Sequence, residues 1–92
     1  MANMTQHAAC RMQQRGIKAE TIEILFVSGA REHDHQGATI LYFDKPARQR
    51  LRHEYGSDRY RKIEGQLNAY AVVAEDGSIV TVGHRTKRIN RH

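Results

Sequence analysis

The hydrophobic pattern begins with a helical period. Three apolar residues recur every four positions near the start of the sequence: Met4, Ala8 and Met12. This spacing places them on one face of a helix. Asn3 or Thr5 is expected to cap that helix, which should run to about Arg15 and end at Gly16.

A second helix is predicted from residue 19 to residue 28. Ile22, Leu25 and Phe26 form its apolar stripe, and Gly29 follows its last residue. The sequence then changes to the composition and period of strands. The run from Ala38 to Phe43 is β-branched and aromatic, which favours a strand.

Four strands are expected in all, over residues 30–34, 38–43, 69–74 and 78–83. Gln36-Gly37 supplies a turn between the first two strands, and Asp76-Gly77 between the last two is the strongest hairpin signal in the sequence. Six apolar residues of the predicted helices and strands are expected in the core: Leu25, Phe26, Ile40, Val72, Val80 and Val82.

A helical segment separates the two pairs of strands. It should begin at Pro46 with Ala47, Leu51 and Tyr55 on one face, stop at Gly56, and continue briefly from Asp58. The continuation should lead to the third strand, and its inward-pointing residues are expected to be Tyr60, Ile63 and Leu67. The element order predicts an α+β fold in a single domain, residues 1–92. Two N-terminal helices pack on an antiparallel sheet of about four strands, with a helical insertion before the C-terminal hairpin.

Length and composition restrict the protein class. The 92 residues are 39% hydrophobic and 27% charged, as in an ordinary globular domain. So short a chain has a small core, which favours a partner or a dimer. The apolar run Ile24–Val27 is too short to span a bilayer, and the N-terminus resembles no secretory signal. The lone Cys10 fits a reducing cytoplasm.

The positive charge is concentrated in the second half of the sequence. Residues 1–46 hold equal numbers of cationic and acidic side chains, so the net charge of +5 lies in residues 47–92. The final run from His84 to His92 contains Arg85, Lys87, Arg88 and Arg91 and no acid. A polyanion partner and a solvated basic tail explain this run equally well.

Two N-terminal features have competing interpretations. His7, Arg11 and Arg15 line one stripe of the first helix, which favours an anion or a carboxylate elsewhere as their partner. The alternative is a solvated face with a strand-borne acid that pairs with one of the arginines. The sequence His33-Asp34-His35 could hold a metal ion, but nothing at a suitable spacing completes the site, so a polar turn is favoured. No metal and no cofactor are expected.

A second basic set lies in the helical segment. Its cations are interleaved with His53, Tyr55 and Tyr60, and they are Arg48, Arg52, Arg59, Arg61 and Lys62. Guanidinium and aromatic planes suit unpaired bases, while cations hold phosphates. The alternative is that the tyrosines belong to the core or its rim, which is favoured for Tyr55.

The final strand ends abruptly in charge. Gly83 allows a close backbone approach, and His84 and Arg85 follow it at the rim of the sheet. A basic residue on a rigid strand end is better placed for chemistry than one on a tail.

Two stretches resemble a known superfamily. Residues 7–17 match the opening H-x-x-x-R-M-x-x-R-G-I of a bacterial family of small domains of unknown function, and residues 79–85 resemble a strand ending in V-G-H-R. That family is grouped with RelE-like toxins in the barnase–EndoU–colicin–RelE fold. The segment from Asp44 to Leu67 is a longer basic insertion than the superfamily pattern contains.

The resemblance implies metal-independent RNA cleavage by attack of a 2′-hydroxyl on the neighbouring phosphate. His7 matches the family's helix histidine and is expected to be the acid or base; Arg85 matches its strand-end cation and would stabilise charge. Arg11, His84 and Arg88 would support them. The Glu–His pair of microbial ribonucleases is missing, which makes His53 and Tyr60 candidate substitutes.

The first hypothesis is therefore a toxin-like endoribonuclease acting on RNA, expected to be mRNA, and neutralised by an antitoxin protein, with the ribosome as a further candidate partner. The alternative is a non-catalytic RNA- or protein-binding module of the same fold. In either case the RNA-binding residues are expected to be Arg15, Arg48, Arg52, Tyr60, Arg61, Lys87 and Arg88. Catalysis requires His7 and Arg85 to converge on one concave basic surface that also receives Arg11 and part of residues 48–62.

Overall fold

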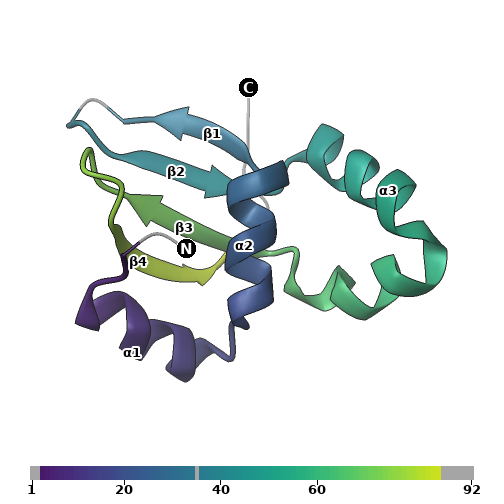
Figure 1. Ribbon diagram of the computed structural model, residues 1–92, viewed down its shortest axis with the longest axis horizontal. Coiled ribbons are helices and arrows are strands. Elements are labelled where there is room, and N and C mark those ends of the chain that lie inside the picture. The colour runs from purple at the N-terminus through teal and green to yellow at the C-terminus, as the bar shows by residue number, and fades with distance from the viewer. Residues whose placement is uncertain (1–2, 35, 86–92) are drawn as a thin grey trace.

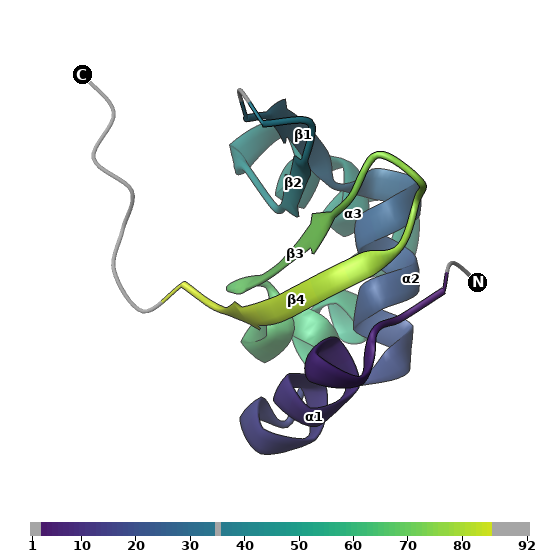
Figure 2. The ribbon, with the colours of Figure 1, turned by 90° about the vertical axis from the view of Figure 1, so that its left-hand side faces the viewer.

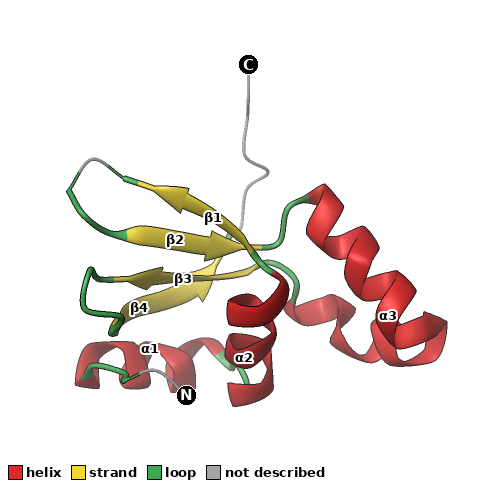
Figure 3. Ribbon diagram, turned by 45° about the horizontal axis from the view of Figure 1, so that its top comes forward, coloured by secondary structure: helices red, strands yellow, loops and turns green. Residues whose placement is uncertain are grey.

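The computed structural model describes residues 3–34 and 36–85. Its helices are α1 (Gln6–Arg15), α2 (Ala19–Ser28) and α3 (Lys45–Ile63), followed by a short 3₁₀ helix, η1 (Glu64–Gln66). Its strands are β1 (Ala30–His33), β2 (Thr39–Tyr42), β3 (Ala69–Val73) and β4 (Ile79–His84). The predicted α+β fold is confirmed, with two helices before the sheet and a helix before the last hairpin (Figures 1 and 3).

The strands form one antiparallel sheet in the order β1-β2-β3-β4 (Figure 1). β2 and β4 therefore end at the same end of the sheet, where β3 begins. α3 leaves the sheet at this end after β2 and returns to it at β3. α2 packs on β2 and β3, and α1 packs on β4; Figure 2 shows α2 on one side of the sheet.

The ends of α1 follow the predicted signals. Thr5 is the N-cap, and its Oγ1 accepts a hydrogen bond of 3.1 Å from the backbone N–H of Ala8. Gly16 ends the helix in the left-handed conformation, at φ 67°, which glycine adopts without strain. The residues before α1 attach it to the sheet, because Met4 forms a parallel bridge with Ile79 at the start of β4.

The core lies between the sheet and the helices. Its largest fully buried side chains are Ile22, Leu25, Leu41, Leu51, Ile79 and Val82. Leu25 and Val82 confirm the prediction. Phe26, Ile40, Val72 and Val80 were expected in the core and are only half-buried. For Ile40 and Val72 the reason is the register: their alternate neighbours Leu41 and Ala71 face the helices instead.

α3 is broken in its middle, as the predicted stop at Gly56 required. Asp44 caps its start by accepting a hydrogen bond of 2.9 Å from the N–H of Ala47. Gly56 has φ 79° and ψ 165°, outside the helical region, so the helix bends into two halves. Ala47 and Leu51 of the first half are buried, and Tyr55, Tyr60 and Ile63 pack partly against the core.

The two hairpin turns are held by carboxylates. Asp34 Oδ1 accepts hydrogen bonds from the N–H groups of Gln36 and Ala38, as expected for a polar turn. Asp76 accepts one from Ser78 N–H at 2.9 Å, which holds the pKa of Asp76 below its usual range. Among the described residues, no helix is long and apolar enough to cross a membrane.

Candidate nucleic-acid interface

The two faces of the sheet differ in what covers them. Leu41, Ala71 and Val82 are in register on adjacent strands and are buried under the helices. The neighbouring row, Tyr42, Tyr70 and Gly83, faces the opposite side, and both tyrosines are only half-buried. We call this second side the open face. Ile40, Val72 and Thr81 form a further half-buried row on it.

Arg85 lies on the open face at the end of β4. Its backbone N–H donates a hydrogen bond of 2.8 Å to the carbonyl of Asn68, just before β3, so the strand end is fixed. Its guanidinium carbon lies 4.3 Å from the centre of the Tyr42 ring and 5.9 Å from that of Tyr70. Both distances are within cation–π range. The result is a half-buried cation held over two aromatic rings from neighbouring strands.

His84 points to the other side of the sheet. It is in register with the buried Ala69, and its Nε2 lies 3.0 Å from the carbonyl oxygen of Arg15, at the end of α1. The last carbonyls of a helix lack partners within the helix, so an imidazole N–H here satisfies one of them. His84 therefore connects α1 to β4 and lies on the opposite face from the Arg85 side chain.

His7 and Arg85 do not converge, contrary to the prediction. The N–H of Thr5 donates to the carbonyl of Ile79 at 2.9 Å, which places the start of α1 beside the start of β4. The bond between His84 and Arg15 places the end of α1 beside the end of β4. The helix and strand thus run in the same direction, and the eight residues from His7 to Arg15 span roughly 12 Å of helix. His7 is exposed and lies beside the start of β4, whereas Arg85 follows the last residue of that strand.

The other cations of α1 differ in exposure. Met4 and Met12 pack against the core and Ala8 is buried, as predicted for the apolar stripe. Arg11 lies at the edge of this packing face and is half-buried, whereas Arg15 is exposed. Of the stripe His7, Arg11 and Arg15, only Arg15 lies at the α3 end of the sheet.

Arg48 connects the two ends of the α3 insertion. Its Nε donates to the carbonyl of Phe43 at 3.2 Å, and its Nη2 donates to the carbonyl of Leu67 at 2.9 Å and to Asn68 Oδ1 at 3.4 Å. These bonds use the guanidinium to join the segment after β2 to the segment before β3. The geometry favours a structural role for Arg48 over the expected contact with RNA.

The bend of α3 brings together three of the residues predicted to bind RNA. Arg52, Tyr60 and Arg61 line one cavity of about 280 Å³, with Ser57 and Glu64. The Arg52 guanidinium carbon lies 6.0 Å from the centre of the Tyr60 ring, across the break at Gly56. His53 lines a different cavity, so it does not form a site with Tyr60. Lys87 and Arg88 lie outside the described residues.

Sequence reasoning missed Tyr42 and Tyr70. Each was placed in a predicted strand, but the contact with Arg85 depends on the register of β2 with β3, which the sequence does not state. One signal was available. In an antiparallel sheet, the end of the second strand, the start of the third and the end of the fourth lie together, and these positions hold Tyr42, Tyr70 and Arg85. Tyrosine is typical of such half-buried positions, because its ring is apolar and its hydroxyl group can stay in contact with water.

Comparisons with known proteins found no match for this protein. No protein-family model matches the sequence. No curated protein and no solved structure matches it either. The superfamily resemblance of residues 7–17 and 79–85 therefore stays a prediction.

Proposed function

We propose that this protein binds single-stranded RNA on the open face of its sheet. The observation that carries the proposal is the position of Arg85 over Tyr42 and Tyr70. Unpaired bases stack on tyrosine rings and guanidinium planes, and antiparallel sheets with exposed aromatic residues are a recurrent platform for them. The guanidinium can also hold a phosphate, since Arg presents several donors to one anion.

The α3 insertion begins and ends next to this surface. It leaves and rejoins the sheet at the end where Tyr42 and Tyr70 lie. Arg52 and Arg61 would contact phosphates there, and Tyr60 would offer a further ring for stacking. The net charge of +5 favours a polyanion as the partner, because each neutralised phosphate releases condensed counterions.

A second candidate, RNA cleavage, depends on the same three residues. Attack of a 2′-hydroxyl on its neighbouring phosphate forms a 2′,3′-cyclic phosphate and releases the 5′-oxygen, which needs a proton. The 2′-hydroxyl would pass its proton to solvent water as its oxygen bonds to phosphorus. Arg85 would stabilise the phosphorane charge, and the hydroxyl of an adjacent tyrosine would donate a proton to the 5′-oxygen as its bond to phosphorus breaks and then regain one from water. His7 takes no part in this version, because it lies at the other end of β4. The superfamily resemblance favours this candidate, whereas the geometry supports binding more directly.

Partners and location follow from the proposal. An antitoxin that neutralised the protein would cover the open face, where Ile40 and Val72 add half-buried apolar surface on the same side as Tyr42 and Tyr70. A cytoplasmic RNA, free or on the ribosome, is the expected target. The exposed Cys10 is a free thiol, which fits that reducing compartment.

The test is fluorescence anisotropy with a labelled oligouridylate of about 12 nucleotides, within the usual site size of such proteins. Tyr42→Ala and Tyr70→Ala should each weaken binding by about 5- to 150-fold, since stacking contributes about 1–3 kcal/mol per base. Arg85→Gln should weaken it by at least about tenfold. The matched control is Arg31→Gln, because Arg31 is in register with Leu41 and faces the helix side. Equal losses in Arg31→Gln and Arg85→Gln would contradict the proposal.

The two candidates are separated by removing only the hydroxyl groups. Tyr42→Phe and Tyr70→Phe keep the rings, so RNA affinity should change by less than about threefold if the protein only binds RNA. If it cleaves RNA, the wild type should produce ends with 2′,3′-cyclic phosphate, and one Tyr→Phe variant should lose most of that activity while it still binds. Absence of cleavage by wild-type protein purified without a partner would leave binding as the function.

A further inference from the structure

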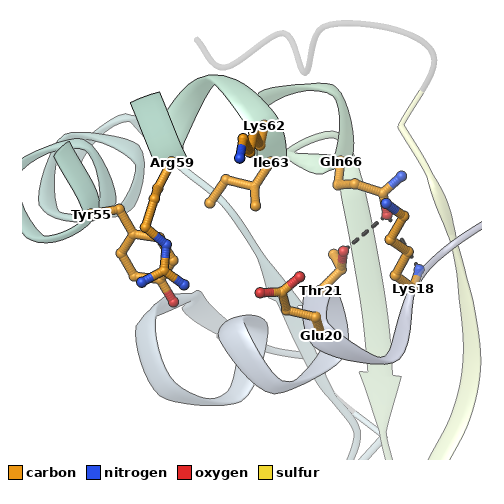
Figure 4. Close-up of a pocket in the computed structure, with 8 residues that line it drawn as sticks. All are labelled: Lys18, Glu20, Thr21, Tyr55, Arg59, Lys62, Ile63 and Gln66. Atoms are coloured by element: carbon orange, nitrogen blue, oxygen red, sulfur yellow. Dashed lines mark hydrogen bonds between the residues drawn. The ribbon is translucent and has the colours of Figure 1, made fainter. Parts of the chain in front are cut away.

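The structure contains a second cationic cavity, separate from the open face. It lies between the start of α2 and the second half of α3 and has a volume of about 390 Å³. Figure 4 shows the residues around it: Lys18, Glu20, Thr21, Tyr55, Arg59, Lys62, Ile63 and Gln66. A volume in this range fits a small organic ligand.

One wall of this cavity is fixed by hydrogen bonds. Gln66 Oε1 accepts from Thr21 Oγ1 at 2.9 Å and from the N–H of Lys18 at 3.3 Å, and its Nε2 donates to the carbonyl of Gly16 at 3.4 Å. Thr21 is buried, so its hydroxyl is held in place. The side-chain amide thus ties η1 to the junction of α1 and α2, and the cavity has a defined shape without a ligand.

The opposite wall holds a cation in a set position. The guanidinium carbon of Arg59 lies 4.9 Å from the centre of the Tyr55 ring, across the break in α3. The ring orients the guanidinium without neutralising it. Ile63 adds an apolar surface between this pair and Gln66 (Figure 4).

The charge of the lining is unbalanced. Three cations, Lys18, Arg59 and Lys62, face a single acid, Glu20. All acidic side chains of the protein belong to the described residues, and Glu20 is the one among them that lines the cavity. The lining therefore has a surplus of two positive charges. A phosphate monoester carries about −1.5 to −2 at pH 7, whereas a phosphodiester carries one negative charge, so the monoester matches the surplus better.

We propose that this cavity binds a phosphate monoester of nucleotide size. Lys18, Arg59 and Lys62 would hold the phosphate, and Ile63 and Tyr55 would contact the organic part. Two sources share this chemistry: a free mononucleotide, and the terminal nucleotide of an RNA strand with a 5′-phosphate. The site is independent of Arg85 and the open face.

The first arm of the test is isothermal titration calorimetry with adenosine 5′-monophosphate and with adenosine. The monophosphate should bind at least about tenfold more tightly, because a charge-assisted hydrogen bond contributes about 1.5–3 kcal/mol. Lys18→Gln and Lys62→Gln should each weaken its binding by about tenfold. Lys45→Gln is the matched control, since Lys45 is exposed at the start of α3 and does not line the cavity. Thermal unfolding should confirm that each variant is folded.

The second arm compares oligoadenylates with a 5′-phosphate and with a 5′-hydroxyl group. A Lys62-dependent preference for the phosphorylated strand identifies a strand end as the ligand, and binding of the monophosphate alone identifies a free nucleotide. The inference is overturned if neither probe binds at millimolar concentration, or if Lys45→Gln weakens binding as much as Lys62→Gln does. It is also overturned if Tyr70→Ala abolishes binding of the monophosphate and Lys62→Gln does not.

These outcomes are independent of the proposed function. Binding of the 5′-hydroxyl strand should depend on Tyr70 and Arg85 and be insensitive to Lys62→Gln. If binding of the 5′-hydroxyl oligoadenylate is unchanged by substitutions at Tyr70 and Arg85, while binding of the monophosphate still depends on Lys62, the open-face proposal fails and the cavity proposal stands.

Discussion

Tyr70 lies so close over Gly83 that a β-carbon at Gly83 would stand 3.0 Å from the tyrosine Oη. The two residues are in register on β3 and β4, and Gly83 is buried beneath the ring. The sequence predicted a close approach at Gly83. The approaching group is the ring of Tyr70, which also lies beside Arg85.

Gly83→Ala should therefore displace the Tyr70 ring and weaken binding of single-stranded RNA by about 3- to 30-fold, a fraction of the stacking energy of a base. Anisotropy with the oligouridylate measures this effect. Gly65→Ala is the control, because a β-carbon at Gly65 would meet nothing within 4 Å. Unchanged affinity in Gly83→Ala would show that the position of Tyr70 does not matter for binding.

Arg48→Lys should destabilise the protein by about 1–3 kcal/mol although it keeps the charge. Lysine cannot reproduce the fork that reaches the carbonyls of Phe43 and Leu67 together. Urea unfolding measures the loss. Arg52→Lys, at an exposed position, should stay within about 0.5 kcal/mol of the wild type. If Arg48→Lys is as stable as the wild type and binds RNA less tightly, Arg48 contacts RNA.

Gly56→Ala should cost about 1–3 kcal/mol, because φ 79° with ψ 165° is a conformation that is essentially restricted to glycine. Space is not the reason, since a β-carbon there would meet nothing within 4 Å. The neighbouring Ser57→Ala serves as the control and should be neutral or slightly stabilising in a helix. Loss of stability in both variants alike would mean that α3 is sensitive to any change near its bend.

Leu25→Ala should lower the free energy of unfolding by about 2–5 kcal/mol, because Leu25 is fully buried in the core. Val27→Ala on the same helix is the matched control. Val27 is 86% exposed, so its truncation should change stability by less than about 0.5 kcal/mol. Chemical denaturation measures both free energies of unfolding. A larger loss in Val27→Ala than in Leu25→Ala would contradict the orientation of the helix.

The sequence predicts element boundaries well where one residue type has a single local use. Thr5 and Gly16 cap α1, Gly56 breaks α3, and Asp76-Gly77 turns the last hairpin, all as expected. Local chemistry decides each of these features. The site is less predictable because it depends on distant partners: Arg85 was identified from its own strand, but the two tyrosines beside it come from two other strands.

His7 shows the same limit. The helix that carries it and the position of Arg85 were both predicted, but the direction of α1 relative to β4 was not. That direction depends on the bridge between Met4 and Ile79 and on the bond between His84 and Arg15, which join residues far apart in the sequence.

The wrong face of β2 was predicted to lie in the core, because both faces are apolar. Ile40 and Tyr42 alternate with Leu41 and Phe43, so a period of two fits either orientation. The structure buries Leu41 completely and leaves Ile40 half-buried on the open face. Apolar residues on a side that no core requires are themselves a sign of a binding surface.

A charge placed at each of these two positions tests the orientation directly. Leu41→Lys should leave little folded protein, because an unpaired ammonium group in the core costs several kcal/mol, comparable to the whole stability of a small domain. Ile40→Lys should remain folded, since a lysine on the open face can extend its ammonium group into water. Circular dichroism and thermal unfolding measure both effects.

If RNA binds the open face, folded Ile40→Lys should bind the oligouridylate at least as tightly as the wild type and show a steeper salt dependence, because it adds a cation beside the bases. A folded Leu41→Lys with an unfolded Ile40→Lys would reverse the two faces and move the proposed RNA-binding surface under the helices, where it could not function.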